Sequence, residues 1–146
     1  MDEKFTTKIT VNVLLKKNNK ILLIKRKNTG YMDGKYAFLG GHVEEGESLR
    51  QAMVREVYEE GSIYLKEDDL TYICAIRNGY SNYINFYFIS SKFDGIPKIS
   101  EPDKEEEMIW VDIKNIPEEM VPNDKRAIYN YLNNIYLDEY NFKEKN

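Results

Sequence analysis

The stretch GHVEEGESLRQAMVREVYEEGSI, residues 41–63, decides the fold, because it carries a periodic pattern together with an unusual set of charges. Leu49, Met53 and Val57 recur every four residues and form one apolar stripe on a helix. This periodicity predicts a helix over Ser48–Glu60 whose apolar side faces the core.

Three carboxylates crowd the C-terminal end of this predicted helix. Glu56 and Glu60 lie one turn apart, and Glu59 lies three residues from Glu56. Like charges at this spacing repel each other, and the negative end of the helix dipole adds to the cost. A divalent cation would reverse both effects, and oxygen ligands suit Mg²⁺, with Mn²⁺ as an alternative. A solvated acidic face is the competing interpretation.

The spacing of the charged residues resembles the Nudix box, G-x5-E-x7-R-E-U-x-E-E-x-G-U, in which U is a bulky aliphatic residue. The matching positions are Gly41, Glu47, Arg55, Glu56, Val57, Glu59, Glu60 and Ile63. One position departs, because Ser62 stands where the pattern has its second glycine. On these residues the chain is identified as a member of the Nudix family.

The residues before the box extend the resemblance. Residues 26–48, RKNTGYMDGKYAFLGGHVEEGES, are similar to the lead-in of the MutT-type branch of bacterial Nudix proteins. That branch usually has a proline before the two glycines, where this chain has Leu39. The change removes a rigid turn residue, and it affects the direction in which the Gly40 carbonyl points. Family members often use this carbonyl as a metal ligand.

Composition bounds the class of protein. The chain has 146 residues, 32% of them charged, a mean hydropathy of −0.63 and a formal net charge of −4. We expect one domain over residues 1–146, with a core over about 7–137. The acidic balance argues against a nucleic-acid-binding surface, and no apolar run reaches membrane-spanning length. A cytoplasmic protein with a buried Cys74 is the expectation.

The rest of the chain predicts strands around the helix. They are Lys8–Lys16, Lys20–Arg26, Tyr36–Phe38, Leu70–Arg77, Tyr83–Ser90 and Met108–Asp112. A final helix is expected, capped by Asn123 or Asp124, with residues from about Asp138 frayed. The expected apolar stripe of that helix is Ile128, Tyr131, Leu132 and Ile135. Hairpins without repeated crossovers imply a mixed sheet, in agreement with the α/β/α sandwich that the resemblance implies.

A second acidic cluster, Glu105-Glu106-Glu107, precedes the last predicted strand. Most such runs are simply solvated, but in Nudix proteins a glutamate from the loop before this strand often reaches the metals or the attacking water. Glu107 is our choice for that role, with Glu105 in reserve. Arg26 is expected to contact a substrate phosphate through its planar fork, and a surface salt bridge is its alternative role.

The resemblance implies a Mg²⁺-dependent hydrolase that cleaves the diphosphate linkage of a nucleoside diphosphate derivative. The expected metal ligands are Glu56, Glu59, Glu60 and the Gly40 carbonyl. The expected catalytic groups are Glu47, Arg55, Glu56 and Glu107, with Arg55 orienting the glutamates and Glu56 or Glu107 as the general base. The expected substrate contacts are Arg26 and Gly41.

The box positions phosphates and says nothing about the base or the sugar. The MutT-type flanks favour a small-molecule nucleotide substrate, a standard or oxidised nucleoside triphosphate that yields a nucleoside monophosphate and pyrophosphate. ADP-ribose and dinucleoside polyphosphates stay open as substrates. A non-catalytic nucleotide-sensing Nudix domain also stays open, and Leu39 and Ser62 are the features that favour it. No nucleic-acid or membrane partner is expected, and a homodimer stays open because many relatives form dimers.

Overall fold

The computed structural model describes residues 3–145, and within that range the chain forms one mixed sheet and two α-helices. The strands are β1 (Lys8–Lys17), β2 (Lys20–Arg26), β3 (Tyr36–Ala37), β4 (Leu39–His42), β5 (Thr71–Asn78), β6 (Tyr83–Ser90), β7 (Glu105–Asp112) and β8 (Leu137–Tyr140). The helices are α1 (Leu49–Gly61) and α2 (Pro122–Asn133), and a short 3₁₀ turn, η1, spans Glu67–Asp69.

The sheet is built around β1. This strand pairs antiparallel with β2 and β4 and parallel with β6, where the register runs from Lys8 opposite Tyr83 to Leu15 opposite Ser90. The strand order is β3-β2-β1-β6-β5-β8, with β4 joined to β1 and β7 joined to β2. Because β5 and β8 form a second parallel pair, the predicted mixed sheet is confirmed.

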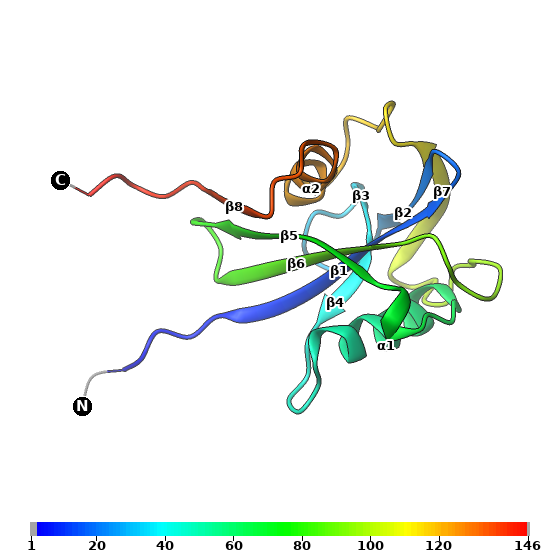
Figure 1. The fold of residues 1–146 in the computed structure, drawn as a ribbon, viewed down its shortest axis with the longest axis horizontal. Helices are drawn as coiled ribbons and strands as arrows, with labels where there is room; N and C mark the ends of the chain where they lie inside the picture. The colour runs from blue at the N-terminus through cyan, green and yellow to red at the C-terminus, as the bar shows by residue number, and fades with distance from the viewer. Residues whose placement is uncertain (1–2, 146) are drawn as a thin grey trace.

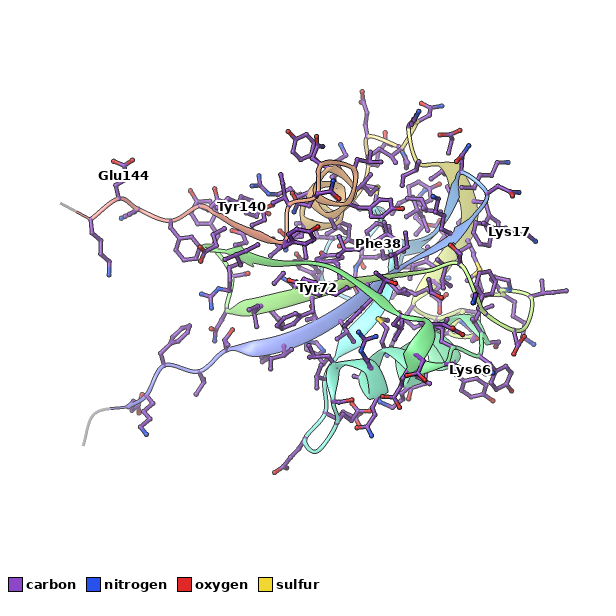
Figure 2. All side chains as sticks on the ribbon, in the orientation of Figure 1. Lys17, Phe38, Lys66, Tyr72, Tyr140 and Glu144 are labelled. Atoms are coloured by element: carbon purple, nitrogen blue, oxygen red, sulfur yellow. The ribbon has the colours of Figure 1, made fainter. Side chains whose placement is uncertain are left out.

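The two helices cover opposite faces of the sheet, as Figure 1 shows. Met53 and Val57 of α1 belong to the core on one face. Ala127 and Ile128 of α2 belong to the core on the other face, together with Phe38 (Figure 2). The predicted α/β/α arrangement is therefore confirmed.

Helix α1 begins and ends close to its predicted bounds. The Ser48 hydroxyl accepts a hydrogen bond from the Gln51 amide, and the Gln51 side chain accepts one from the Ser48 amide, which forms a capping box. At the other end Ser62 adopts a left-handed conformation with φ 56°, and its amide donates to the Tyr58 carbonyl. The predicted helix Ser48–Glu60 is thus confirmed to within one residue.

The strand that leads into the box differs from its expected bounds. β3 ends at Ala37, and a separate strand, β4, begins at Leu39 and continues through Gly40 and Gly41. Leu39 lies opposite Val13 of β1 and is 1% exposed. The backbone around the glycine pair is therefore regular strand held by β1, without the proline that the MutT-type branch uses there.

The second acidic cluster belongs to a strand and not to a loop, so the expected start of that strand at Met108 is wrong. β7 begins at Glu105, and its first residues pair with β2. Glu105 lies opposite Arg26, and Glu107 lies opposite Lys25. The ion pair across these strands joins Nζ of Lys25 to Oε2 of Glu106 at 4.0 Å, and opposite charges across a strand pair are favourable.

Two expectations about the final helix are wrong. Neither Asn123 nor Asp124 is the N-cap. The cap is Val121, two residues before Asn123, and α2 begins at Pro122. Proline suits the first helical position, where no amide donor is needed. The apolar stripe is also shorter than expected. Leu132 is 49% exposed, and Ile135 lies beyond the C-cap at Asn134.

The expectation of frayed residues from Asp138 is wrong for residues 138–140, which belong to β8, and for residue 146 it lies outside the described residues. β8 pairs in parallel with β5, from Leu137 opposite Ala75 to Tyr140 opposite Asn78, and Figure 2 marks Tyr140 beside the sheet edge. Cys74 of β5 is buried as expected. In residues 3–145 no helix is both long and apolar enough to cross a membrane.

Candidate active site

Each of the two glycines of β4 lets a neighbouring element approach closely, β1 at Gly40 and α1 at Gly41. A side chain at Gly41 would collide with the carboxylate of Glu56, and one at Gly40 would collide with the β1 backbone at Val11. The Gly40 amide donates a hydrogen bond of 2.7 Å to Oε1 of Glu60. The glycine pair therefore holds two box carboxylates directly against the β4 backbone.

Arg55 organises the charged groups at the outer side of α1. Its guanidinium binds the Glu47 carboxylate through two hydrogen bonds, of 2.7 and 2.9 Å. The same group donates to Glu56 at 3.0 Å, to Glu59 at 3.2 Å and to the His42 carbonyl at 3.0 Å. The Arg55 hydrogen bond, with help from a backbone amide, lowers the pKa of Glu47 to about 2. Arg55 is thus a clamp between the start of the box and its glutamates.

Glu56 and Glu60 have the opposite electrostatic environment. Burial raises the pKa of Glu56 to about 7, although Arg55 opposes the shift. Burial, followed by repulsion from Glu56, raises the pKa of Glu60 well above its usual value, and the charges of Glu105 and Glu101 add to the effect. Four carboxylates therefore repel one another at the C-terminal end of α1, where a cation would relieve the repulsion.

The donor set fits a hard divalent cation, because it consists of carboxylate oxygens. Across residues 3–145, however, no three acidic, histidine or cysteine side chains are already gathered tightly enough to hold an ion. Arg55 contacts both Glu56 and Glu59 in this arrangement. The Glu59 side chain is 48% exposed. Glu56, Glu59 and Glu60 could hold an ion together only if Glu59 exchanged its contact with Arg55 for one with the ion.

The structure separates the two glutamates that were considered for the second acidic cluster. Glu107, the first choice, accepts a hydrogen bond of 2.9 Å from the Tyr36 hydroxyl. Glu105, the reserve, is 3% exposed, and its Oε2 atom has no hydrogen-bond partner among residues 3–145. Burial raises the pKa of Glu105 to about 7. The charge of Glu105 contributes to the raised pKa of Glu60, whereas Glu107 contacts Tyr36 of β3.

Arg26 is committed to the loop that follows β2. Its guanidinium donates to the Tyr31 carbonyl at 2.8 Å and to the Thr29 hydroxyl at 3.1 Å. The guanidinium carbon also lies 5.4 Å from the centre of the Tyr31 ring. A phosphate contact by Arg26 would require some of these bonds to be exchanged.

Comparison with known proteins agrees with this geometry. A model of the NUDIX domain matches residues 6–132. The chain belongs to the Nudix family. It is a Nudix hydrolase, and enzymes of this family act on pyrophosphate bonds of nucleotide derivatives.

Similar proteins differ in what they act on. An ADP-ribose pyrophosphatase of Methanocaldococcus jannaschii is 35% identical over 119 residues, which are 80% of this chain and 69% of that protein. An 8-oxo-dGTP diphosphatase of Escherichia coli is 40% identical over 55 residues, 38% of this chain and 43% of that protein. The crystal structure of a MutT NUDIX hydrolase from Burkholderia pseudomallei has a TM-score of 0.79 at 24% identity, covering 86% of this chain and 98% of that one. That structural likeness shows the Nudix fold.

The sequence suggested only a capping role for Asp124, but in this Nudix hydrolase the residue is buried and hydrogen-bonded to other elements. Asp124 is 5% exposed and accepts hydrogen bonds from the Phe38 amide at 3.0 Å and the Tyr87 hydroxyl at 2.6 Å. Burial raises its pKa to about 6. Asp124 thereby ties the start of α2 to the residue between β3 and β4. The signal in the sequence was ambiguous, because an aspartate near a helix start is usually a cap.

Proposed function

We propose that this Nudix hydrolase is a Mg²⁺-dependent pyrophosphohydrolase, with Mn²⁺ as an alternative metal, that cleaves a standard or oxidised nucleoside triphosphate. The products are a nucleoside monophosphate and pyrophosphate. One observation carries the proposal: the Glu56 and Glu60 carboxylates converge on the backbone of Gly40 and Gly41. Two carboxylates held side by side and partly desolvated are stabilised by a bound cation and are costly without one.

The chain's own residues divide the work. Glu56 and Glu60 would hold the cation, and Glu59 would be the third ligand if it exchanged its contact with Arg55 for one with the ion. When bound, the cation would neutralise phosphate oxygens and lower the pKa of the attacking water. Arg55, anchored on Glu47 by two hydrogen bonds, keeps the Glu56 carboxylate in a fixed orientation.

Hydrolysis also needs a base. As the water oxygen bonds to phosphorus and the bridging P–O bond breaks, a carboxylate accepts the water proton and pyrophosphate leaves. We assign this role to Glu105, with Glu56 as the second candidate. Glu105 has a free Oε2 atom and a pKa near operating pH, whereas Glu107 accepts a hydrogen bond from Tyr36.

ADP-ribose is the second candidate substrate. The observation that favours it is the 35% identity to an ADP-ribose pyrophosphatase over 80% of this chain. ADP-ribose carries the same diphosphate linkage, so the same metal site would serve it. Cleavage would then yield AMP and ribose 5-phosphate.

The test is release of phosphate or pyrophosphate products across a nucleotide panel, at about 5 mM Mg²⁺, which lies above the usual range of KM. The panel holds standard and oxidised triphosphates, ADP-ribose, diadenosine polyphosphates and nucleotide sugars, each with and without chelator. We expect turnover of triphosphates that chelator abolishes. Turnover of ADP-ribose alone would select the second candidate.

Two variants test the assigned ligands in the same assay. Glu59→Gln and Glu60→Gln are each expected to lower Mg²⁺-dependent turnover by roughly 100-fold. Near-wild-type turnover by either variant means that its ligand assignment is wrong. Nucleotide binding without turnover of any compound would replace the proposal with a sensing role, and Leu39→Pro and Ser62→Gly would then test whether activity returns.

A further inference from the structure

Ser62 occupies the backbone position at which α1 ends. Its φ of 56° lies in the left-handed region, where glycine is favoured because it has no Cβ. The serine therefore holds its side chain there at a conformational cost. A contact made by the side chain would explain why a serine is useful at this position.

The Ser62 hydroxyl makes such a contact, with the hydroxyl of Ser100. Ser100 lies in the segment 91–104 between β6 and β7, 38 residues further along the chain. Figure 1 shows this segment passing the C-terminal end of α1. The hydrogen bond thus joins the end of the box helix to a segment distant in sequence.

Backbone hydrogen bonds run beside this side-chain contact. The Ser100 amide donates to the Glu60 carbonyl at 3.2 Å, and the Lys98 amide donates to the Gly61 carbonyl at 3.1 Å. These two carbonyls belong to the last turn of α1, where helical partners are absent. The segment 91–104 is therefore docked on the helix end that carries the box glutamates.

The docked segment leads directly into an acidic turn, residues 101–105. Glu101 follows Ser100, its amide donates to Oε1 of Glu105 at 3.3 Å, and its carbonyl accepts from the Glu105 amide at 2.9 Å. Glu105 is 3% exposed and keeps one oxygen free among the described residues. Ser100 is hydrogen-bonded to the end of α1 and directly precedes this turn. The position of Ser100 therefore affects the distance between the turn and the box glutamates.

We propose that Ser62 is a positioning residue that acts through Ser100 to hold the acidic turn 101–105 at the metal-binding end of α1. This inference rests on the proposed function, because it assumes a metal site at Glu56 and Glu60. Loss of either hydroxyl lets the turn shift. Metal affinity and kcat then fall, while the KM for the nucleotide changes little.

The experiment compares Ser62→Ala, Ser100→Ala and the double variant with wild type. Ser100→Thr keeps a hydroxyl, and Ser91→Ala removes an exposed serine from the same segment as the matched control. Mn²⁺ affinity is measured without substrate from the electron paramagnetic resonance signal of the free ion. Exchange of the Ser100 amide and steady-state kinetics are measured on the same proteins.

We expect both alanine variants to bind Mn²⁺ about 5-fold more weakly and to lower kcat by about 10-fold, with faster Ser100 amide exchange. The double variant should have the same Mn²⁺ affinity and kcat as the single alanine variants, because all three lose the same hydrogen bond. Ser100→Thr and Ser91→Ala should behave like wild type. Unchanged Mn²⁺ affinity in both alanine variants, additive losses, or a wild type that binds no Mn²⁺ would overturn the inference. A wild type that binds Mn²⁺ but hydrolyses nothing refutes the proposed function alone, and the Mn²⁺ affinities of the variants then decide this inference.

Discussion

Glutamates of the same box are held in opposite electrostatic states by their immediate neighbours. The Arg55 guanidinium lowers the pKa of Glu47 to about 2, whereas burial raises the pKa of Glu56 to about 7. The difference arises because Glu47 gains two charge-assisted hydrogen bonds while Glu56 loses water. Glu47 is therefore suited to anchoring Arg55, and Glu56 is suited to binding a cation.

Gly41→Ala tests the close approach of α1 to β4. The added methyl group would collide with the Glu56 carboxylate, so we expect Glu56 to move and kcat/KM to fall by roughly 100-fold, as misplacement of a catalytic group by about 1 Å does. The measurement is steady-state hydrolysis, with circular dichroism to verify folding. A folded Gly41→Ala protein with wild-type kcat/KM would show that Glu56 needs no such placement.

Glu105→Gln and Glu107→Gln form a matched pair at two positions of the same strand. We expect Glu105→Gln to lower kcat by on the order of 10²- to 10⁴-fold and to remove the acidic limb of the pH–rate profile, since general-base catalysis contributes about that much. Glu107→Gln keeps an oxygen that can accept the hydrogen bond from the Tyr36 hydroxyl, so we expect its kcat to stay close to that of wild type. If Glu107→Gln is the inactive variant and Glu105→Gln is active, the roles are reversed.

Among the larger elements, β8 shows how the edge of the sheet is closed. This strand pairs with β5, and its Asp138 accepts two hydrogen bonds from Arg126 of α2, at 2.9 and 2.6 Å. Asn130 adds a third at 3.0 Å. These bonds join α2, β8 and the sheet, so the C-terminal strand reinforces the packing of α2 on its face.

Asp138→Asn tests that junction through pH. The Arg126 hydrogen bonds lower the pKa of Asp138 relative to an ordinary aspartate. The ionised carboxylate therefore stabilises the fold above the pKa of the unfolded state, about 4, and this contribution is lost as the pH falls through the lowered folded pKa. At pH 7 we expect the variant to be less stable by about 1 kcal/mol, a modest value because Arg126 is partly exposed.

The measurement is urea unfolding of wild type and Asp138→Asn from pH 7 down to pH 3. The difference in unfolding free energy should shrink as the pH falls. Glu139→Gln, at an exposed position of the same strand, is the control and should show little difference at any pH. A difference that is constant with pH would mean that the carboxylate charge has no part in it.

For the molecule as a whole, the sheet brings three distant segments to one place. β4 supplies the glycines, α1 supplies the box glutamates, and the first residue of β7 supplies Glu105. The carboxylates of Glu56, Glu60 and Glu105 repel one another, which destabilises the metal-free fold. Binding of the proposed cation would therefore raise the free energy of unfolding.

This coupling predicts that Mg²⁺ raises the melting temperature of the wild-type protein. At a concentration about 100 times Kd, the ion adds about 2.7 kcal/mol, which corresponds to a rise of roughly 8 °C for a chain of this size. Glu60→Gln should melt at or above the wild-type temperature without metal and gain little from Mg²⁺. Differential scanning calorimetry measures both, and an equal Mg²⁺ shift in wild type and Glu60→Gln would argue against binding at this site.

Local patterns in the sequence predicted the box helix, most strands, the mixed sheet and the spacing of the box carboxylates. These features depend on residues a few positions apart, so periodicity and capping reveal them. These local patterns did not predict the C-terminal strand β8. β8 is polar and depends on hydrogen bonds from β5 and on Arg126, which lie far away in sequence.

The sequence by itself determined the family, the bounds of α1 to within one residue and the placement of Glu56, Glu59 and Glu60 on one end of α1. Only the tertiary structure decided that Glu105 and not Glu107 contributes to the raised pKa of Glu60, that Asp124 is a buried anchor, and that Ser62 meets Ser100. The reason is physical. The direction of a side chain within a helix or strand follows from the local backbone geometry. The side chain that it contacts on another element depends on the register between strands that are far apart in sequence.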